Sequence, residues 1–361
     1  MNREREYGID ALRIVSMLLI VVLHVLNEGG VLYLLNELSF RHAVAWFLST
    51  ASLTCVNCYA LISGYVGVNS KRKASSILEL WLQVVFYSVL LSVVVHILKP
   101  GQVPADEWIK GLFPLSHNYY WYYTAYFFIS LMMPLMNRML LAVSKEELFC
   151  VLASSLTAVT LISVIGTQGR FLMNEGYSAL WLLMLYLAGG CIRLYGDEYR
   201  SYRFIKKHAV WLFLLGITAA WAVRVFVGDA KVPVVLGWEL PSNVLMNYVS
   251  PAILLSSVSL FALFAGWKPG VQMCKWIARI SPATFGVYLI HVHPLVWRHY
   301  FINGFVTLVY LEAYVLPFGV FGAAAGVFAV CAAIDLIRAK LFRMLRIREG
   351  CRRLFAKFGL S

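Results

Sequence analysis

The chain has 361 residues, of which 61% are apolar and only 14% are charged. Soluble globular domains are about half apolar and about one quarter charged, so this composition excludes a water-soluble globule. The formal net charge of +13 does not indicate a nucleic-acid-binding surface, because the basic residues lie between long apolar runs rather than in one patch.

Ten apolar runs are candidates for membrane-spanning helices, since a helix needs about 20 residues to cross the hydrocarbon core of a bilayer. They lie at residues 11–32, 44–65, 76–98, 119–141, 148–165, 178–194, 209–227, 244–267, 283–302 and 308–337. The short apolar stretch 232–240 is predicted to be loop. We therefore expect an all-α polytopic membrane protein with about ten transmembrane helices.

The distribution of lysine and arginine tests this topology. With the N-terminus inside, 23 of the 31 basic residues fall in cytoplasmic segments and 6 fall in outer segments. The remaining two, Arg13 and Arg224, lie within predicted spans. Because cytoplasmic loops are enriched in Lys and Arg, the pattern predicts that both termini are cytoplasmic. It also explains the positive net charge of the chain.

The first span and its start carry several ionisable residues, which are Asp10, Arg13, His24 and Glu28. The eleven residues from Arg13 to His24 make about three full turns of helix, so these two side chains lie on one face, roughly 16 Å apart along the axis. Arginine suits phosphate, and histidine is the side chain best able to exchange a proton near neutral pH. The structural alternative is that His24 hydrogen-bonds to a neighbouring helix and Arg13 reaches lipid headgroups; spacing alone does not choose between them.

Two other patterns have a structural interpretation that we favour. Cys55 and Cys58 form a C-x-x-C within a predicted span, with no second pair, so small-residue packing explains them better than metal or redox chemistry. The cluster of aromatic residues at 119–123 follows the long outer loop and fits an interfacial aromatic belt. A sugar-stacking surface at the outer mouth is compatible with the same residues.

An ordered set of motifs resembles the membrane acyltransferase-3 family. The segments are YGIDALR (7–13), the arginine, ten residues and histidine of Arg13 to His24, NEGG (27–30), NCYALISGY (57–65), the basic KRK (71–73) and ISPATFGVYLIH (280–291). The resemblance covers nearly the whole chain and is greatest to members that modify bacterial surface polysaccharides. It implies a membrane acyltransferase domain at 1–345, followed by a basic cytoplasmic tail at 346–361.

The resemblance implies transfer of an acyl group, commonly acetyl, from cytoplasmic acyl-CoA to a hydroxyl of a surface or envelope glycan or lipid-linked saccharide. We expect the CoA co-substrate to meet basic groups at the cytoplasmic mouth, with membrane lipids around the protein, in a bacterial plasma membrane. The residues assigned to the CoA site are Arg13, Ser63, Gly64, Tyr65, Lys71, Arg72 and Lys73. Gly64 would allow close backbone approach by a ligand, whereas ordinary positive-inside charge also explains each residue of Lys71, Arg72 and Lys73.

The reacting centre is assigned to His24, as general base or as transient acyl carrier. Glu28, one turn further on, is the predicted catalytic partner that orients the imidazole, with Asn27 as a second candidate. Residues assigned to the acceptor are Asn27, Trp121, Tyr123 and His291. We expect no metal, because the histidines do not cluster, and no nucleic-acid partner.

Two rival functions remain open to the sequence. A transporter or flippase for a small solute or a lipid-linked sugar would also carry intramembrane charges, but it favours matched broken spans in two halves. The prolines within spans, Pro134, Pro251, Pro294 and Pro317, form no such match. A non-catalytic scaffold of a glycan-export complex would leave the shared face of Arg13 and His24 unexplained.

Overall fold

A computed structural model describes residues 5–37, 39–70, 74–165, 170–229 and 243–357, and in these ranges every regular element is a helix. The helices of the first half are α1 (Tyr7–Leu26), α2 (Val31–Leu34), α3 (Phe40–Ser52), α4 (Thr54–Gly67), α5 (Ala74–Leu98), α6 (Ala105–Leu112), α7 (Trp121–Ala142) and α8 (Lys145–Ile165). Those of the second half are α9 (Ala179–Tyr195), α10 (Arg200–Lys207), α11 (Ala209–Ala222), α12 (Pro251–Ala265), α13 (Val271–Ile280), α14 (Thr284–His291), α15 (Pro294–Val296), α16 (Leu316–Met344) and α17 (Ile347–Lys357). Short 3-10 or π segments, of which η5 (Ser281–Ala283) and η6 (Trp297–Phe301) matter below, join them.

The predicted all-α membrane class is confirmed, with a difference in how the spans are built. Eight helical segments of the described residues are long and apolar enough to cross a membrane. The predicted span at 244–267 is instead the fifteen-residue α12, and the one at 283–302 breaks into α14, α15 and η6. Proline lacks a backbone N–H and disfavours helix in the residue before it, so the chain leaves the helix just before Pro294.

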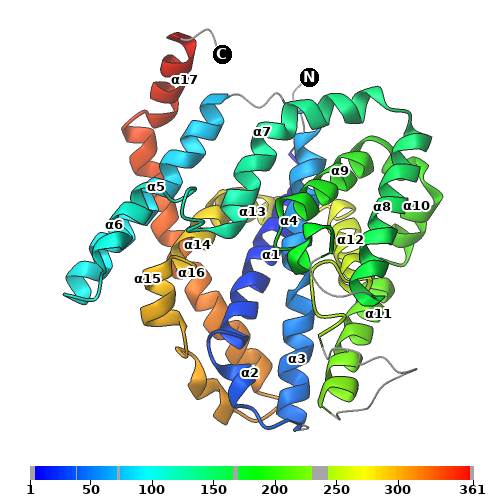
Figure 1. The fold of residues 1–361 in the computed structure, drawn as a ribbon, viewed down its shortest axis with the longest axis horizontal. Helices are drawn as coiled ribbons and strands as arrows, with labels where there is room; N and C mark the ends of the chain where they lie inside the picture. The colour runs from blue at the N-terminus through cyan, green and yellow to red at the C-terminus, as the bar shows by residue number, and fades with distance from the viewer. Residues whose placement is uncertain (1–4, 38, 71–73, 166–169, 230–242, 358–361) are drawn as a thin grey trace.

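Helix α1 lies at the centre of the bundle (Figure 1). None of its residues is exposed, and it packs against α3, α4, α12, α13, α14 and α16. A helix that is apolar on all sides is buried within a bundle, which fits its sequence. The few polar side chains on α1 are therefore held inside protein rather than in lipid, where they would be costly.

Glycines let α4, a neighbour of α1, and α9 approach each other closely. A Cβ at Gly64 of α4 would lie 1.8 Å from the carbonyl oxygen of Tyr186 on α9, and a Cβ at Gly189 of α9 would lie 2.1 Å from the carbonyl oxygen of Leu61. Small residues at helix interfaces allow such backbone contact within membranes. Helix α9 is thus held tightly against α4, which in turn packs against α1.

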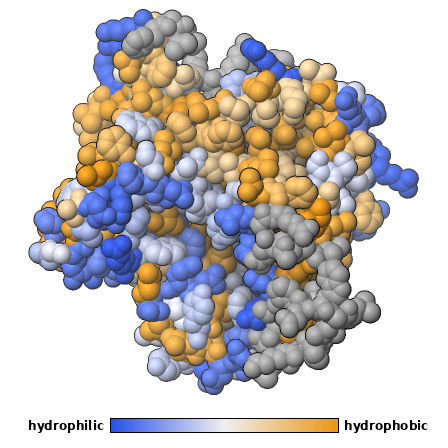
Figure 2. All heavy atoms as spheres, viewed as in Figure 1, coloured by the Kyte–Doolittle hydropathy of each residue, from blue (hydrophilic) through white to orange (hydrophobic). Residues whose placement is uncertain are grey.

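The surface in Figure 2 is largely apolar in its upper part. Polar side chains gather near α6, through the middle of the view and toward its lower end. The short helix α6 has an acidic first turn and exposes Ile109 and Leu112, a pattern typical of a helix lying at a membrane surface. The basic tail forms α17, which packs against α5.

Candidate active-site cavity

Arg13 and His24 open onto one cavity of about 580 Å³. Between them on α1, Met17, Ile20 and Leu23 complete the same wall, as expected for residues three or four apart on one helix face. The shared face predicted from spacing therefore borders an actual space within the bundle. The other walls come from α4, α5, α7, η5 and α14 and from the chain before α5, α9 and α12. Their lining residues are Val56, Tyr59, Ile62, Ser63, Val66, Gly67, Ser70, Ser76, Leu80, Gln83, Trp121, Tyr122, Tyr126, Met133, Tyr177, Tyr248, Ser281, Pro282, Thr284, Phe285 and Tyr288.

Aromatic rings make up much of this lining. The ring centroids of Trp121 and Tyr177 lie 4.7 Å apart, and those of Tyr177 and Tyr248 lie 5.1 Å apart. Trp121 begins α7, and the two tyrosines lie just before α9 and α12. Tyr122 and Tyr126 stack with centroids 6.4 Å apart on the same wall. Rings with one polar edge offer an apolar face and a hydrogen-bonding group to a bound molecule.

His24 is held from behind by a second histidine. Its Nδ1 lies 3.1 Å from Nε2 of His291 on α14, and Nδ1 of His291 lies 2.7 Å from the backbone carbonyl oxygen of Val287. The rings of His24 and of Trp297 on η6 pack edge to face, with their centroids 4.8 Å apart. His291 is only 1% exposed and is not part of the cavity lining. The imidazole of His24 thus reaches the cavity from a fixed, largely aromatic surround.

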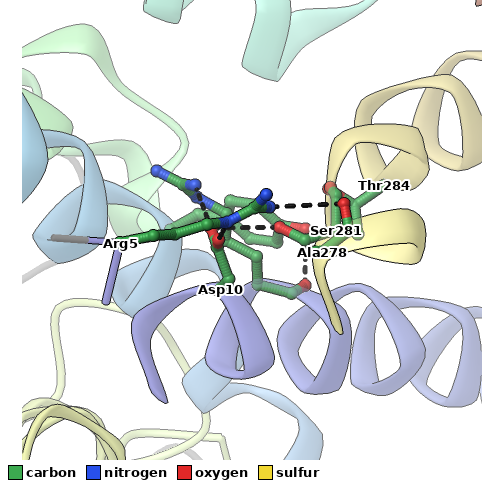
Figure 3. A network of polar contacts seen from close by, with 7 residues as sticks. Arg5, Asp10, Ala278, Ser281 and Thr284 are labelled. Carbon is green, nitrogen blue, oxygen red and sulfur yellow. Dashed lines mark hydrogen bonds and ion pairs between the residues drawn. The ribbon is translucent and has the colours of Figure 1, made fainter. Parts of the chain in front are cut away.

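Arg13 is held by a carboxylate that it shares with Arg5. Nη1 of Arg13 and Nε of Arg5 each lie 2.6 Å from a different oxygen of Asp10. Asp10 is 7% exposed, and Ser281 of η5 donates a third hydrogen bond to it from its hydroxyl, at 3.2 Å. Figure 3 shows Asp10 rising from α1 toward Arg5 and toward Ser281 on the opposite element. One negative charge between two guanidiniums leaves a net positive charge at this end of the cavity.

A second cavity of about 380 Å³ adjoins the first at Arg13. Arg13 and Val66 line both spaces, and the second is completed by Arg5, Glu6, Ile9, Asp10 and Tyr65. Arg193 at the end of α9 forms an ion pair with Glu6, and its Nη1 lies 2.9 Å from the hydroxyl of Tyr65. Arg5 and Arg13 therefore border the second cavity, and Arg13 also lines the main cavity together with His24.

The structure separates the residues assigned to the CoA site. Ser63 lines the main cavity, although its hydroxyl is bonded to the carbonyl of Tyr59, and Tyr65 lines the second cavity. Gly64 is explained by helix packing instead of ligand approach, because the backbone of Tyr186 occupies the space beside it. Lys71, Arg72 and Lys73 lie outside the described residues.

The structure gives the imidazole of His24 a partner other than the two predicted ones. Its hydrogen bond joins it to His291, and among the described residues none joins it to Glu28 or Asn27. Both of these lie in the turn after α1 and neither is part of the cavity lining, although one carboxylate oxygen of Glu28 is buried with no hydrogen-bond partner in the described structure. Their contact with a substrate stays a prediction.

The residues assigned to the acceptor also divide. Trp121 lines the main cavity, whereas Tyr123 is fully buried outside that lining, against Phe127 and Phe285. His291 lies behind His24 rather than beside a substrate. The cavity rings of Tyr177 and Tyr248 were missed, because both lie outside the long helices, in the connections before α9 and α12, where no periodic pattern marks a wall.

Asp10 was seen as a charge in the first span but given no role. A signal was present, since Asp10 and Arg13 are three residues apart and side chains at that spacing meet on one helix face. Among the described residues, no group of three or more His, Cys, Asp and Glu side chains is arranged to hold a metal ion. The arrangement supplies a fixed imidazole and fixed guanidiniums joined by a cavity, which suits proton transfer beside a bound anion.

Comparison with known proteins places this arrangement in a family. No curated protein and no solved structure matches the chain. A family model described as an acyltransferase domain, that of the acyltransferase-3 family, matches residues 6–337, which include α1 with Arg13 and His24 and extend into α16. This match covers nearly the whole chain and agrees with the motifs read from the sequence, so the chain belongs to the acyltransferase-3 family of membrane acyltransferases.

Proposed function

We propose that this acyltransferase moves an acyl group, acetyl in the simplest case, from acyl-CoA to a hydroxyl of a surface or envelope glycan in the bacterial plasma membrane. The observation that carries the proposal is the single cavity lined by both Arg13 and His24. Anion-binding and proton-accepting groups joined by one space match a donor with phosphates at one end and a thioester at the other.

The basic end is the proposed site of the CoA phosphates. Arg13 and Arg5 share one carboxylate, so together they keep an unbalanced positive charge beside the second cavity. Guanidinium groups bind phosphate through paired N–H donors. The pantetheine arm would then extend along Met17 and Ile20, both of which line the main cavity, and bring the thioester to His24.

The aromatic lining near Trp121, Tyr177 and Tyr248 is the proposed acceptor site. Sugar rings present apolar C–H faces that pack on aromatic side chains, while their hydroxyls hydrogen-bond to groups at the rim. In the predicted topology these residues and His24 are nearer the outer face, where a glycan or lipid-linked saccharide would arrive.

The reaction then needs one general base. His24 takes the proton of the acceptor hydroxyl as the oxygen attacks the thioester carbonyl carbon. The carbon–sulfur bond breaks, and the sulfur leaves as a thiolate that takes the proton back from His24. The products are the acyl ester and free CoA thiol, and His24 returns to its neutral form.

Purified protein in liposomes provides the test. Radiolabelled acetyl-CoA should be consumed, with the label appearing on an added glycan acceptor or, more slowly, as acetate released to water. Both processes should require His24. A well-folded protein that neither bound acetyl-CoA nor consumed it would overturn the proposed donor, and label loss that was independent of His24 would overturn the proposed mechanism.

A further inference from the structure

The hydrogen bonds of the His24–His291 pair determine which ring nitrogen of each histidine carries the proton. A neutral imidazole carries one N–H donor and one acceptor nitrogen. The Val287 carbonyl can only accept, so Nδ1 of His291, 2.7 Å away, carries the proton. Nε2 of His291 is then an acceptor, and Nδ1 of His24, 3.1 Å from it, must donate. The remaining nitrogen of His24, Nε2, is left with its lone pair.

That lone pair is available to the cavity. His24 is part of the cavity lining and His291 is not, so the nitrogen of His24 that is not bonded to His291 is the one a substrate can meet. Within the described part of the chain, no protein group forms a hydrogen bond with Nε2 of His24. The hydrogen bonds that link Val287, His291 and His24 therefore leave Nε2 of His24 as a proton acceptor facing the cavity.

We propose that His291 is a positioning residue that holds His24 in the tautomer required of the base. This inference rests on the proposed function and adds to it the reacting atom, Nε2 of His24. Without an acceptor behind it, His24 could carry its proton on Nε2 and would then have no lone pair toward the acceptor hydroxyl. When Nε2 takes the substrate proton, the Nδ1–H bond to His291 becomes a charge-assisted bond that stabilises the imidazolium.

A neutral partner also suits the membrane location better than the carboxylate expected from the sequence. A buried carboxylate behind His24 would place a charge in the bundle core throughout the catalytic cycle, at a cost in desolvation. Histidine accepts the same hydrogen bond while remaining uncharged. His291 is 1% exposed and its own proton is committed to Val287, so it orients His24 without competing for the substrate proton.

Two substitutions at His291 separate positioning from packing. His291→Gln keeps an oxygen acceptor near the position of Nε2, whereas His291→Leu fills the space without one. We expect His291→Leu to lower kcat by about 10²-fold, at the lower end of the cost of losing a general base, with the KM for acetyl-CoA little changed. His291→Gln should recover at least about tenfold of that loss. Equal activities in the two variants would show that only packing is required.

His293 supplies the matched control. It is fully buried two residues away, but its ring bonds to the Ser88 carbonyl and to the Leu295 amide rather than to His24. His293→Leu should reduce the yield or thermal stability of the protein while kcat per folded molecule changes less than about twofold. A kcat loss equal to that of His291→Leu would overturn the specific role of His291.

The tautomer itself can be observed without turnover. Nitrogen-15 NMR of histidine-labelled protein in lipid distinguishes protonated from unprotonated ring nitrogens, and His24→Gln identifies the signals of His24. We expect protonated Nδ1 and unprotonated Nε2 in the wild type, and a mixture of tautomers in His291→Leu. Finding Nε2 of His24 protonated in the wild type would overturn the inference, even if acyl transfer were confirmed. Conversely, the expected spectrum in a protein without transfer activity would sustain the geometry and reject the proposed function.

Discussion

The carboxylate of Asp10 lies 2.6 Å from the guanidinium of Arg13, in a partly buried cluster that also contains Arg5 and Ser281. The cluster joins the start of α1 to the η5 turn, which is 271 residues away in sequence from Asp10. A single carboxylate thus sets the position of the arginine that borders both cavities and ties together two of the elements that line them.

We expect Asp10→Ala to destabilise the fold, because it removes the partner of two guanidiniums and a hydroxyl in one step. Hydrogen bonds to charged groups each contribute about 1.5–3 kcal/mol, and the partial exposure of both arginines places the total near the lower figure. Thermal unfolding in detergent measures the change. Asp106→Ala, which removes an exposed ion pair with Lys110, is the control and should leave the midpoint unchanged. Equal shifts in the two variants would contradict the structural role of Asp10.

Arg13→Ala should weaken acyl-CoA binding by roughly ten- to a hundredfold, the cost of losing a charge-assisted contact. Equilibrium binding of CoA to purified protein is the direct measurement, and Arg13→Lys should fall between the wild type and Arg13→Ala. Arg41, which bonds to the Val309 carbonyl and borders neither cavity, provides the control variant Arg41→Ala. If Arg13→Ala bound CoA normally and lost only the chemical step, Arg13 would have no phosphate role.

His24→Ala should abolish acyl transfer while the protein still folds and inserts, since its ring borders a cavity rather than filling a packed core. Loss of a general base costs roughly 10²–10⁴-fold in rate. Turnover of radiolabelled acetyl-CoA in liposomes measures the loss, with CoA binding as the check that the site is intact. His117, exposed before α7, is the control, and His117→Ala should retain full activity. Near wild-type turnover in His24→Ala would exclude it as the base.

Cysteines along α1 can test whether the donor arm lies between Arg13 and His24. Met17→Cys and Ile20→Cys should react with small thiol reagents and be protected by CoA, because both positions line the cavity. Val21 and Val22 are fully buried outside the lining, so cysteines there should stay unmodified.

Cys150 is exposed and Cys274 is half-buried, so both should first be replaced by serine to lower the background reaction with thiol reagents. Labelling of the cavity positions without protection by CoA would mean that the donor binds elsewhere, while the cavity itself would stand. Absence of labelling at Met17→Cys and Ile20→Cys would contradict an accessible passage.

Gly64→Ala should severely destabilise the protein through the α4–α9 contact. The added Cβ would meet the Tyr186 carbonyl oxygen at 1.8 Å, and overpacking of this kind costs about 1–3 kcal/mol or more. Gly326→Ala on α16 has nothing within 4 Å of its Cβ and should be neutral or stabilising by up to about 1 kcal/mol. Thermal unfolding compares the two. A stable Gly64→Ala protein with weakened CoA binding would restore the ligand-binding interpretation of Gly64.

Features that depend on neighbouring residues in the chain could be predicted from the sequence. Long apolar runs with few charges determine membrane helices, since every backbone N–H and C=O must be bonded within the segment. Helical periodicity likewise places Arg13 and His24 on one face of α1. Helix continuity was harder to predict, because α14 ends before Pro294 although the surrounding residues at 283–302 remain apolar.

Only the tertiary structure decided which residues contact the face of α1 that carries Arg13 and His24. His291 is 267 residues from His24, so no local pattern could select it over Glu28, one turn away on the same chain. Gly64 shows the same limit, since a glycine that admits a ligand and one that admits a neighbouring helix look alike in sequence. The sequence by itself determined which side chains share the central helix face. The packing of α14, η5 and α9 around α1 determined their partners, because hydrogen bonds and close contacts between distant segments exist only once the helices are brought together.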